Sequence, residues 1–160
     1  MSEDRPRRAP TREQLRTWRD YIETAEALRG RLGSRLQSES ELTTGDYQVL
    51  LALTEAEDRT LRSSELADLI GWERSRLSHH LGRMERRGLI SRQACADDVH
   101  GIDVIATDAG SAAFRAGSVP HLRAIRELFL DALTPAQLNE VDDITQALRR
   151  HLGLKSLSEH

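Results

Sequence analysis

The sequence predicts a mainly α-helical protein with one small β-hairpin. Leu, Ala, Arg and Glu dominate the composition and only 4% of residues are aromatic, so helix formers far outnumber strand formers. Apolar residues recur at helical spacing along most of the chain and alternate only around residues 89–106. With 160 residues, the chain has the size of one domain. We expect this domain to span residues 11–152, between a flexible arm at 1–10 and a flexible tail at 153–160.

The first helix is predicted over residues 11–38, where an apolar stripe continues for about seven turns. A stripe of this length exceeds what the core of so small a domain requires. It therefore indicates a partner that covers the helix. The stripe consists of Leu15, Trp18, Ile22, Ala25, Leu28, Leu32 and Leu36.

A second helix follows, with Thr43 as its N-cap and Asp46 in its first turn, where a carboxylate favours the helix dipole. A third, short helix is predicted with Ser64 as its N-cap and Gly71 at its end, in the left-handed conformation that glycine adopts easily. The core-facing residues are expected to be Tyr47, Leu50, Leu51 and Leu53 in the second helix, and Leu66, Leu69 and Ile70 in the third.

The next helix lies in the stretch "ERSRLSHHLGRMERRGLI", residues 73–90, which is basic although the whole chain has a formal net charge of −3. Leu77, Leu81 and Met84 share one face and are expected in the core. The opposite side offers hydroxyl, imidazole and guanidinium groups without an acid, a composition that suits the major groove of DNA. A solvated basic face paired with acids elsewhere is the alternative interpretation. The polar side consists of Ser75, Arg76, Ser78, His79, Gly82, Arg83 and Arg86.

After this helix, alternating apolar residues flank the polar tip "ADDVHG" and predict a β-hairpin over residues 89–106. Thr107 is expected to cap a further helix that breaks at Pro120. The last helix is predicted from Thr134 as N-cap, with Gln137 completing a capping box. Its expected buried stripe consists of Leu138, Val141, Ile144 and Leu148.

Two short helices joined by a glycine turn and followed by a hairpin indicate a winged helix-turn-helix at about residues 43–106, whose second helix enters the groove. The order of a long helix, "DYQVLLALTEA", "SSELADLIGWERSRLSHHLGRMERRGLI", an acidic-tipped hairpin, "TDAG" and two final helices resembles the MarR family of bacterial transcription regulators over about residues 15–152. The resemblance implies a homodimer on a pseudo-palindromic operator, held together by dimerisation helices at about 11–38 and 107–152.

The same resemblance implies roles for individual side chains. Ser75, Arg76, Ser78 and His79 match the positions that read bases or line the groove wall, and Arg83 and Arg86 match phosphate contacts. Arg74 is expected at the DNA without an assigned role.

Two residues depart from the family pattern. The hairpin tip lacks the usual arginine, and His100 is the only obvious substitute there. Glu73 stands where a Ser or Thr N-cap is expected, and its carboxylate would lie near phosphates.

The family's effector pocket makes Trp18, Tyr21 and Tyr47 candidate walls for a small aromatic or phenolic ligand that releases DNA. Cys95, the single cysteine, is expected to be a small packed thiol, with a redox-responsive regulator as the alternative. A non-specific architectural DNA-binding protein is a further alternative, which the acidic net charge disfavours.

No enzyme motif, cofactor or metal site is predicted. The adjacent histidines His79 and His80 point about 100° apart on a helix and cannot bind one metal together. The sequence has no signal peptide and no long apolar run, so a cytoplasmic location is expected.

Overall fold

The computed structural model describes residues 9–154. Residues 1–8 of the predicted arm and 155–160 of the predicted tail lie outside this range. The described chain is mainly helical with one small antiparallel sheet, as predicted. Its elements in order are α1 (Arg12–Ser40), α2 (Thr44–Glu55), η1 (Glu57–Arg59), β1 (Thr60–Arg62), α3 (Ser63–Ile70), α4 (Arg74–Arg86), β2 (Ile90–Ala94), β3 (Ile102–Ala106), α5 (Asp108–Leu128), η2 (Leu130–Ala132) and α6 (Pro135–His151).

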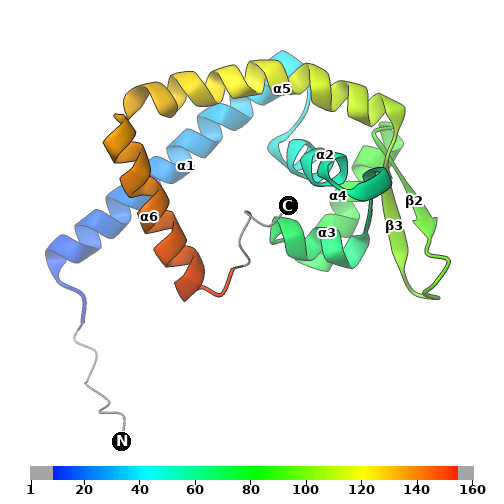
Figure 1. Ribbon diagram of the computed structural model, residues 1–160, viewed down its shortest axis with the longest axis horizontal. Coiled ribbons are helices and arrows are strands. Elements are labelled where there is room, and N and C mark those ends of the chain that lie inside the picture. Colours follow the sequence, from blue (N-terminus) through cyan, green and yellow to red (C-terminus); the bar gives the residue numbers. More distant parts are fainter. Residues whose placement is uncertain (1–8, 155–160) are drawn as a thin grey trace, which may run out of the picture.

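These elements form two regions, which Figure 1 shows side by side. Helices α2, α3 and α4 and the sheet make a compact unit, residues 42–106, which we name the lobe. Helices α1, α5 and α6 form the second region and are named the outer helices. Helix α5 packs along α1, and α6 begins at the end of α5 that lies away from the sheet (Figure 1).

The predicted hairpin is confirmed, with Ile90 of β2 paired to Ala106 of β3. The sheet has a third strand that the sequence did not predict, because β1 pairs with the other side of β3 and the strand order is β1-β3-β2. A strand of three residues is too short to show an alternating pattern. It also follows Asp58 and Arg59, which both have positive φ angles.

Helix boundaries follow the predicted caps in most places. Thr43, Thr107 and Thr134 are N-caps whose side chains accept backbone N–H groups of their own first turns. Gly71 ends α3 with a φ of 71°. The predicted cap at Ser64 is wrong. The N-cap is Arg62, two residues earlier, and α3 begins at Ser63, because the carboxylate of Glu65 accepts the N–H of Arg62 and fixes the first turn there.

The predicted break at Pro120 is also wrong, since α5 continues through this proline to Leu128. A proline removes one backbone hydrogen bond from a helix interior. Packing of α5 against α1 holds the helix together, and tertiary packing supplies most helical stability in proteins.

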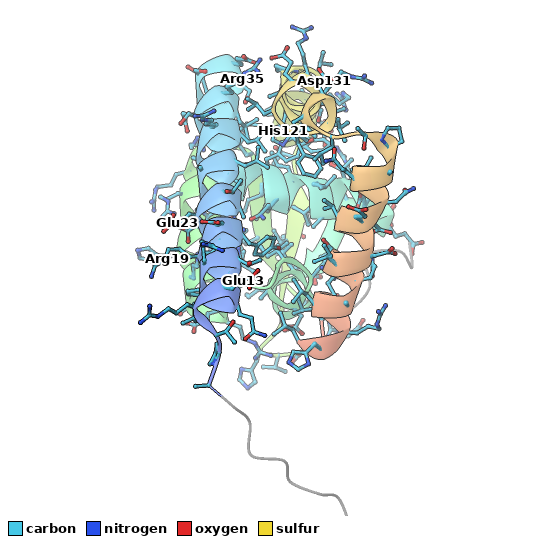
Figure 2. The ribbon with its side chains drawn as sticks, turned by 90° about the vertical axis from the view of Figure 1, so that its left-hand side faces the viewer. Glu13, Arg19, Glu23, Arg35, His121 and Asp131 are labelled. Atoms are coloured by element: carbon cyan, nitrogen blue, oxygen red, sulfur yellow. The ribbon has the colours of Figure 1, made fainter. Side chains whose placement is uncertain are left out.

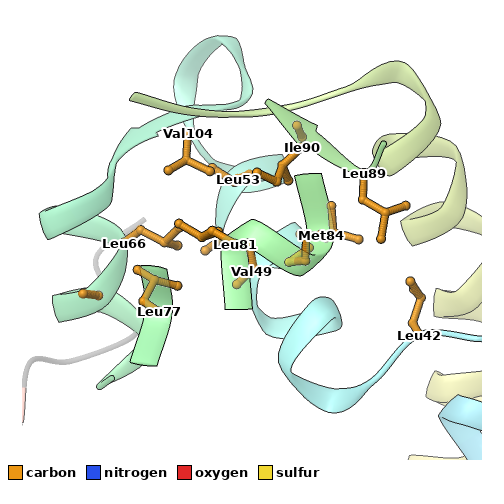
Figure 3. Packing of buried hydrophobic residues seen from close by; sticks show 14 of the residues in the cluster. Leu42, Val49, Leu53, Leu66, Leu77, Leu81, Met84, Leu89, Ile90 and Val104 are labelled. Atoms are coloured by element: carbon orange, nitrogen blue, oxygen red, sulfur yellow. The ribbon is translucent and has the colours of Figure 1, made fainter. Parts of the chain in front are cut away.

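The hydrophobic core lies in the lobe, between its three helices and the sheet (Figure 3). Leu50, Leu53 and Leu66 are buried as predicted, and Ile70 is half-buried. Leu51 and Leu69 were predicted in the core but are exposed. Each helix turns only one face inward, and Leu51 and Leu69 lie on the flanks of the faces that Leu50 and Leu66 occupy.

The outer helices leave most of their apolar stripes uncovered. Of the predicted α1 stripe, only Leu36 is buried. Helix α6 has no buried residue, so its predicted buried stripe is wrong for a single chain: 55% of Ile144 is accessible. Trp18 and Tyr21 of α1 and Ile144 and Leu148 of α6 line an open groove between the two helices. Figure 2 shows α1 and α6 in front of the lobe, on the side of the molecule that faces away from it. Among residues 9–154, no helix is both long and apolar enough to cross a membrane.

Candidate nucleic-acid interface

Helix α4 is fixed in the lobe by its apolar face. Leu77, Leu81 and Met84 are buried, as predicted from their spacing. Glu73 is the N-cap residue, but its side chain makes no capping hydrogen bond. The left-handed turn at Gly71 directs the chain from α3 into α4, so that the opposite face of α4 is turned to solvent.

The residues predicted to bind DNA share this solvent-facing side. All of the following are exposed: Arg74, Ser75, Arg76, Ser78, His79, Arg83 and Arg86. The structure therefore brings together every recognition-helix residue that the sequence proposed. Gly82, on the same side, is half-buried, and Arg86 Nη1 would be 4.0 Å from a Cβ atom added there.

The arginines of this region fall into two groups. Arg74, Arg76, Arg83 and Arg86 have no carboxylate partner among residues 9–154. Arg87, which had no predicted role, pairs with Asp46 at 2.7 Å and also donates to the carbonyl oxygen of Glu41. It is a structural residue that ties α4 to α2. The unpaired arginines leave a positive surface that can accept phosphates and base edges.

Glu85, the one acid within α4, is neutralised by an arginine of strand β2. Arg92 of β2 pairs with its carboxylate at 3.0 Å, and the backbone N–H of Arg92 donates to the other oxygen at 2.9 Å. These hydrogen bonds from the Arg92 side chain and backbone lower the pKa of Glu85. The acid therefore holds the sheet to α4 and does not oppose a polyanion.

His80 is buried. The sequence analysis gave this residue no role of its own and considered it only together with the adjacent His79. Its Nε2 atom lies 2.9 Å from Oδ1 of Asp46, and its Nδ1 atom lies 3.0 Å from Nη2 of Arg83. The backbone N–H of Thr43 also donates to Asp46. Burial alone would raise the pKa of Asp46, but the contacts with His80, Thr43 and Arg87 outweigh it and lower this pKa below its ordinary value.

Helical spacing could have predicted that His80 is buried. Position 80 lies three residues after Leu77 and four before Met84, on the buried face of the helix. Asp46, to which it is joined, had been interpreted only as a helix-dipole residue. Periodicity places His80 inward, but it does not name the partner.

At the wing tip, His100 is exposed and its backbone N–H donates to Oδ1 of Asp98. Val99 beside it is 94% exposed. Asp98 also lies 3.7 Å from Arg62 and offsets the charge of this arginine. Cys95 is half-buried at the base of the same turn.

The three aromatic residues proposed for an effector pocket are not brought together in the single chain. Trp18 and Tyr21 line a groove between α1 and α6, with Ile144 and Leu148 on its other side. Tyr47 is not among the residues that line this groove.

Tyr47 belongs to a different cluster, on α2 and α5. Its ring packs against Phe114 and His121, with ring centroids 5.0 Å and 4.5 Å away, and its hydroxyl lies 3.3 Å from Ser118 Oγ. Burial lowers the pKa of His121.

A helix-turn-helix with a three-stranded wing and an exposed basic second helix defines a winged-helix DNA-binding transcription regulator. A family model described as "MarR family" matches residues 40–98. AbsC, a MarR family transcriptional regulator from Streptomyces coelicolor, is 32% identical, with coverage of 92% of this chain and 99% of AbsC and a TM-score of 0.85. The present chain belongs to the MarR family.

Two further solved structures are similar. Sco3205, a MarR family transcriptional regulator from Streptomyces coelicolor whose structure is in complex with DNA, is 35% identical, with coverage of 96% of this chain and 94% of that chain and a TM-score of 0.86. The organohalide-sensing regulator RdhR-CbdbA1625, in its 2,4-dichlorophenol-bound form, shares the fold at 18% identity, with coverage of 92% and 89% and a TM-score of 0.77. No curated protein matches the chain.

Proposed function

We propose that this regulator is a homodimer that binds a specific pseudo-palindromic duplex, with α4 of each protomer in the major groove of one half-site. The observation that carries the proposal is the solvent-facing side of α4, where four arginines have no carboxylate partner among the described residues. Phosphates and guanine edges would supply the hydrogen-bond acceptors and the negative charge that these arginines lack within the chain.

Within this face, Arg76 reads bases, since a guanidinium can bind guanine bidentately. Ser75, Ser78 and His79 meet base edges or the groove wall. Arg83 and Arg86 contact phosphates near the C-terminal end of α4. Arg74 contacts the DNA near the start of the helix, and His100 makes a weak wing contact.

The dimer is proposed to form through the outer helices. Trp18 is 61% exposed and Ile144 is 55% exposed in the single chain, although both belong to long apolar stripes. Exposed apolar surface of this extent is typical of a protein interface. A second copy of the chain would cover both stripes and present two α4 helices about one helical turn of DNA apart, as in other dimeric helix-turn-helix proteins.

Regulation by a small aromatic or phenolic ligand is proposed at the groove that Trp18 and Tyr21 line. The dichlorophenol bound to the structural relative RdhR-CbdbA1625 supports this class of ligand. Tyr47 would bound a separate site beside His121. A ligand that changes the spacing of the two α4 helices would couple to DNA binding by about 1 to 3 kcal/mol.

Footprinting of the protein on its own upstream region tests the proposal. Arg76→Ala should lose the discrimination between the protected duplex and a scrambled one. Arg86→Ala should weaken both duplexes and reduce the slope of log K against log salt by about one unit, if it neutralises one phosphate. Equal losses on both duplexes for Arg76→Ala would refute its base-reading role. Equal wild-type affinity for both would favour the architectural alternative.

The same footprint tests the regulatory alternatives. Addition of phenols and aromatic acids should release the protected duplex from the wild type and not from Tyr21→Ala, which alters the groove without removing a residue of the α1 apolar stripe. Peroxide should release it only if Cys95 is a redox switch, and Cys95→Ser is the matched control. Release by neither treatment would remove both forms of regulation.

A further inference from the structure

Two aromatic rings lie beneath the arginines of α4. Trp72 is half-buried in the turn before α4, and His80 is buried within the helix. The rings meet edge to face, with their centroids 5.2 Å apart and an interplanar angle of 88°. We name Trp72 and His80 the ring pair.

His80 contacts Arg83, and this contact requires one tautomer of the imidazole ring. The guanidinium of Arg83 can only donate, so Nδ1 of His80, 3.0 Å away, must accept. The ring hydrogen is therefore on Nε2, which faces the carboxylate of Asp46 at 2.9 Å. A chain of contacts thus runs from α2 through the imidazole to an exposed arginine.

Asp46 is itself held firmly, so the chain starts from a fixed point. Its other oxygen, Oδ2, accepts the backbone N–H of Thr43 at 2.9 Å and a guanidinium N–H of Arg87 at 2.7 Å. A carboxylate held in this way orients the imidazole that faces it, as the partners of a histidine commonly do.

Trp72 contacts a second arginine, Arg76. The guanidinium carbon of Arg76 lies 4.0 Å from the centroid of the indole ring, within the range of a cation–π interaction. A long arginine side chain that is stacked on a ring loses less freedom when it binds DNA than one that is free in solvent.

Gly45 of α2 allows the rings to pack so close to that helix. A Cβ atom at this position would lie 2.8 Å from Cη2 of Trp72 and 2.8 Å from Cε1 of His80. Neither ring atom can move away easily, because each belongs to a rigid ring. Any larger residue at position 45 would push on the ring pair from the side of α2.

We propose that the ring pair positions the recognition arginines before DNA arrives, with His80 holding Arg83 and Trp72 holding Arg76. The inference rests on the proposed function of α4, and it adds two positioning residues that need not touch DNA themselves. They make the geometry of the basic face depend on the N-terminal end of α2.

A double-mutant cycle on the full chain tests the His80 branch, with the duplex that the wild type protects as the probe. His80→Gln keeps an N–H donor for Asp46 but has no acceptor at the Nδ1 position. We expect its affinity to fall about three- to tenfold, as far as that of Arg83→Ala, and the double variant to bind no more weakly than Arg83→Ala. His80→Asn, which places an oxygen near the Nδ1 position, should bind more tightly than His80→Gln.

A second double-mutant cycle, with Arg76→Ala, tests the role of Trp72, and Trp72→Phe is its conservative control. Trp72→Leu should reduce discrimination against a scrambled duplex about three- to tenfold and add nothing to Arg76→Ala. Trp72→Phe keeps an aromatic face and should retain most of the discrimination. Gly45→Ala should weaken binding as well, although alanine is the better helix former.

Circular dichroism and thermal unfolding of each variant separate positioning from folding. If a His80 variant fails to fold, the Trp72 cycle and Gly45→Ala decide the question. Losses that multiply within both cycles, wild-type affinity in the ring variants, or tighter binding by them would overturn the inference and leave the proposed function intact. Wild-type binding by both Arg76→Ala and Arg83→Ala would overturn the role of α4 itself.

Discussion

The lobe buries its apolar residues within one chain, whereas the outer helices leave most of theirs exposed. In the lobe, apolar residues from α2, α3, α4 and the sheet bury one another within a single chain (Figure 3). In α1 and α6, most residues of equal hydrophobicity stay accessible, and Leu36 of α1 is the exception among the predicted stripes of the two helices. The lobe therefore holds its own core, whereas the outer helices need a second surface. Four substitutions test this difference, from the largest expected effect to the smallest.

The largest effect is expected for a truncation in the lobe. Leu81 is 1% exposed, so Leu81→Ala would leave a cavity between α4 and the sheet. We expect the free energy of unfolding to fall by roughly 2 to 5 kcal/mol. Urea unfolding at one fixed protein concentration measures it. A loss below about 1 kcal/mol would mean that the lobe core is not the main source of stability.

The next effect concerns assembly rather than folding. Ile144→Glu places a charge in the exposed stripe of α6 and should weaken the proposed dimer at least about a hundredfold, because a buried unpaired charge is costly. Analytical ultracentrifugation measures the dissociation constant. Leu69→Glu is the matched control, since Leu69 is 41% exposed but lies on α3 in the lobe. If both variants dissociate equally, the outer helices are not the specific interface.

A third substitution tests the polar link inside the lobe. Asp46→Asn should lower the free energy of unfolding at pH 7 by about 2 kcal/mol, because it removes a charged partner of Arg87 and His80. The pKa of Asp46 is lower in the folded state than the unfolded value of about 3.9. Protons therefore bind the unfolded chain preferentially, and the wild type loses this stability as the pH falls below about 4.

The difference between wild type and Asp46→Asn should accordingly shrink in urea unfolding between pH 5 and pH 2. Asp68→Asn, at an exposed acid of α3, is the control and should change little at any of these values. A difference that stays constant across the range would contradict the role of the Asp46 charge.

The smallest effect is expected at the start of α4. Glu73→Ser supplies the missing cap and should raise the free energy of unfolding by roughly 0.5 to 1 kcal/mol. It also removes a negative charge near the proposed phosphates, so DNA should bind slightly more tightly. Glu73→Gln removes the charge without a good cap. Equal stability of the Ser and Gln variants would show that capping does not limit α4.

Much of the fold could be predicted because it depends on local chemistry. Threonine caps at Thr43, Thr107 and Thr134, the glycine turn at Gly71 and the helical spacing of apolar residues all act over a few positions. The sequence predictions fail where contacts with a distant segment determine the local structure. Packing against α1 carries α5 through Pro120, and pairing with β3 makes a strand of residues 60–62.

The sequence by itself determined the exposed basic face of α4, because the spacing of Leu77, Leu81 and Met84 fixes which side of a helix is buried. Only the tertiary structure decided what each charged residue of that region does. Arg87 pairs with Asp46, 41 positions away in the sequence, and Arg83 contacts His80. Helical periodicity gives a direction for each side chain, but a partner depends on how two helices are packed together.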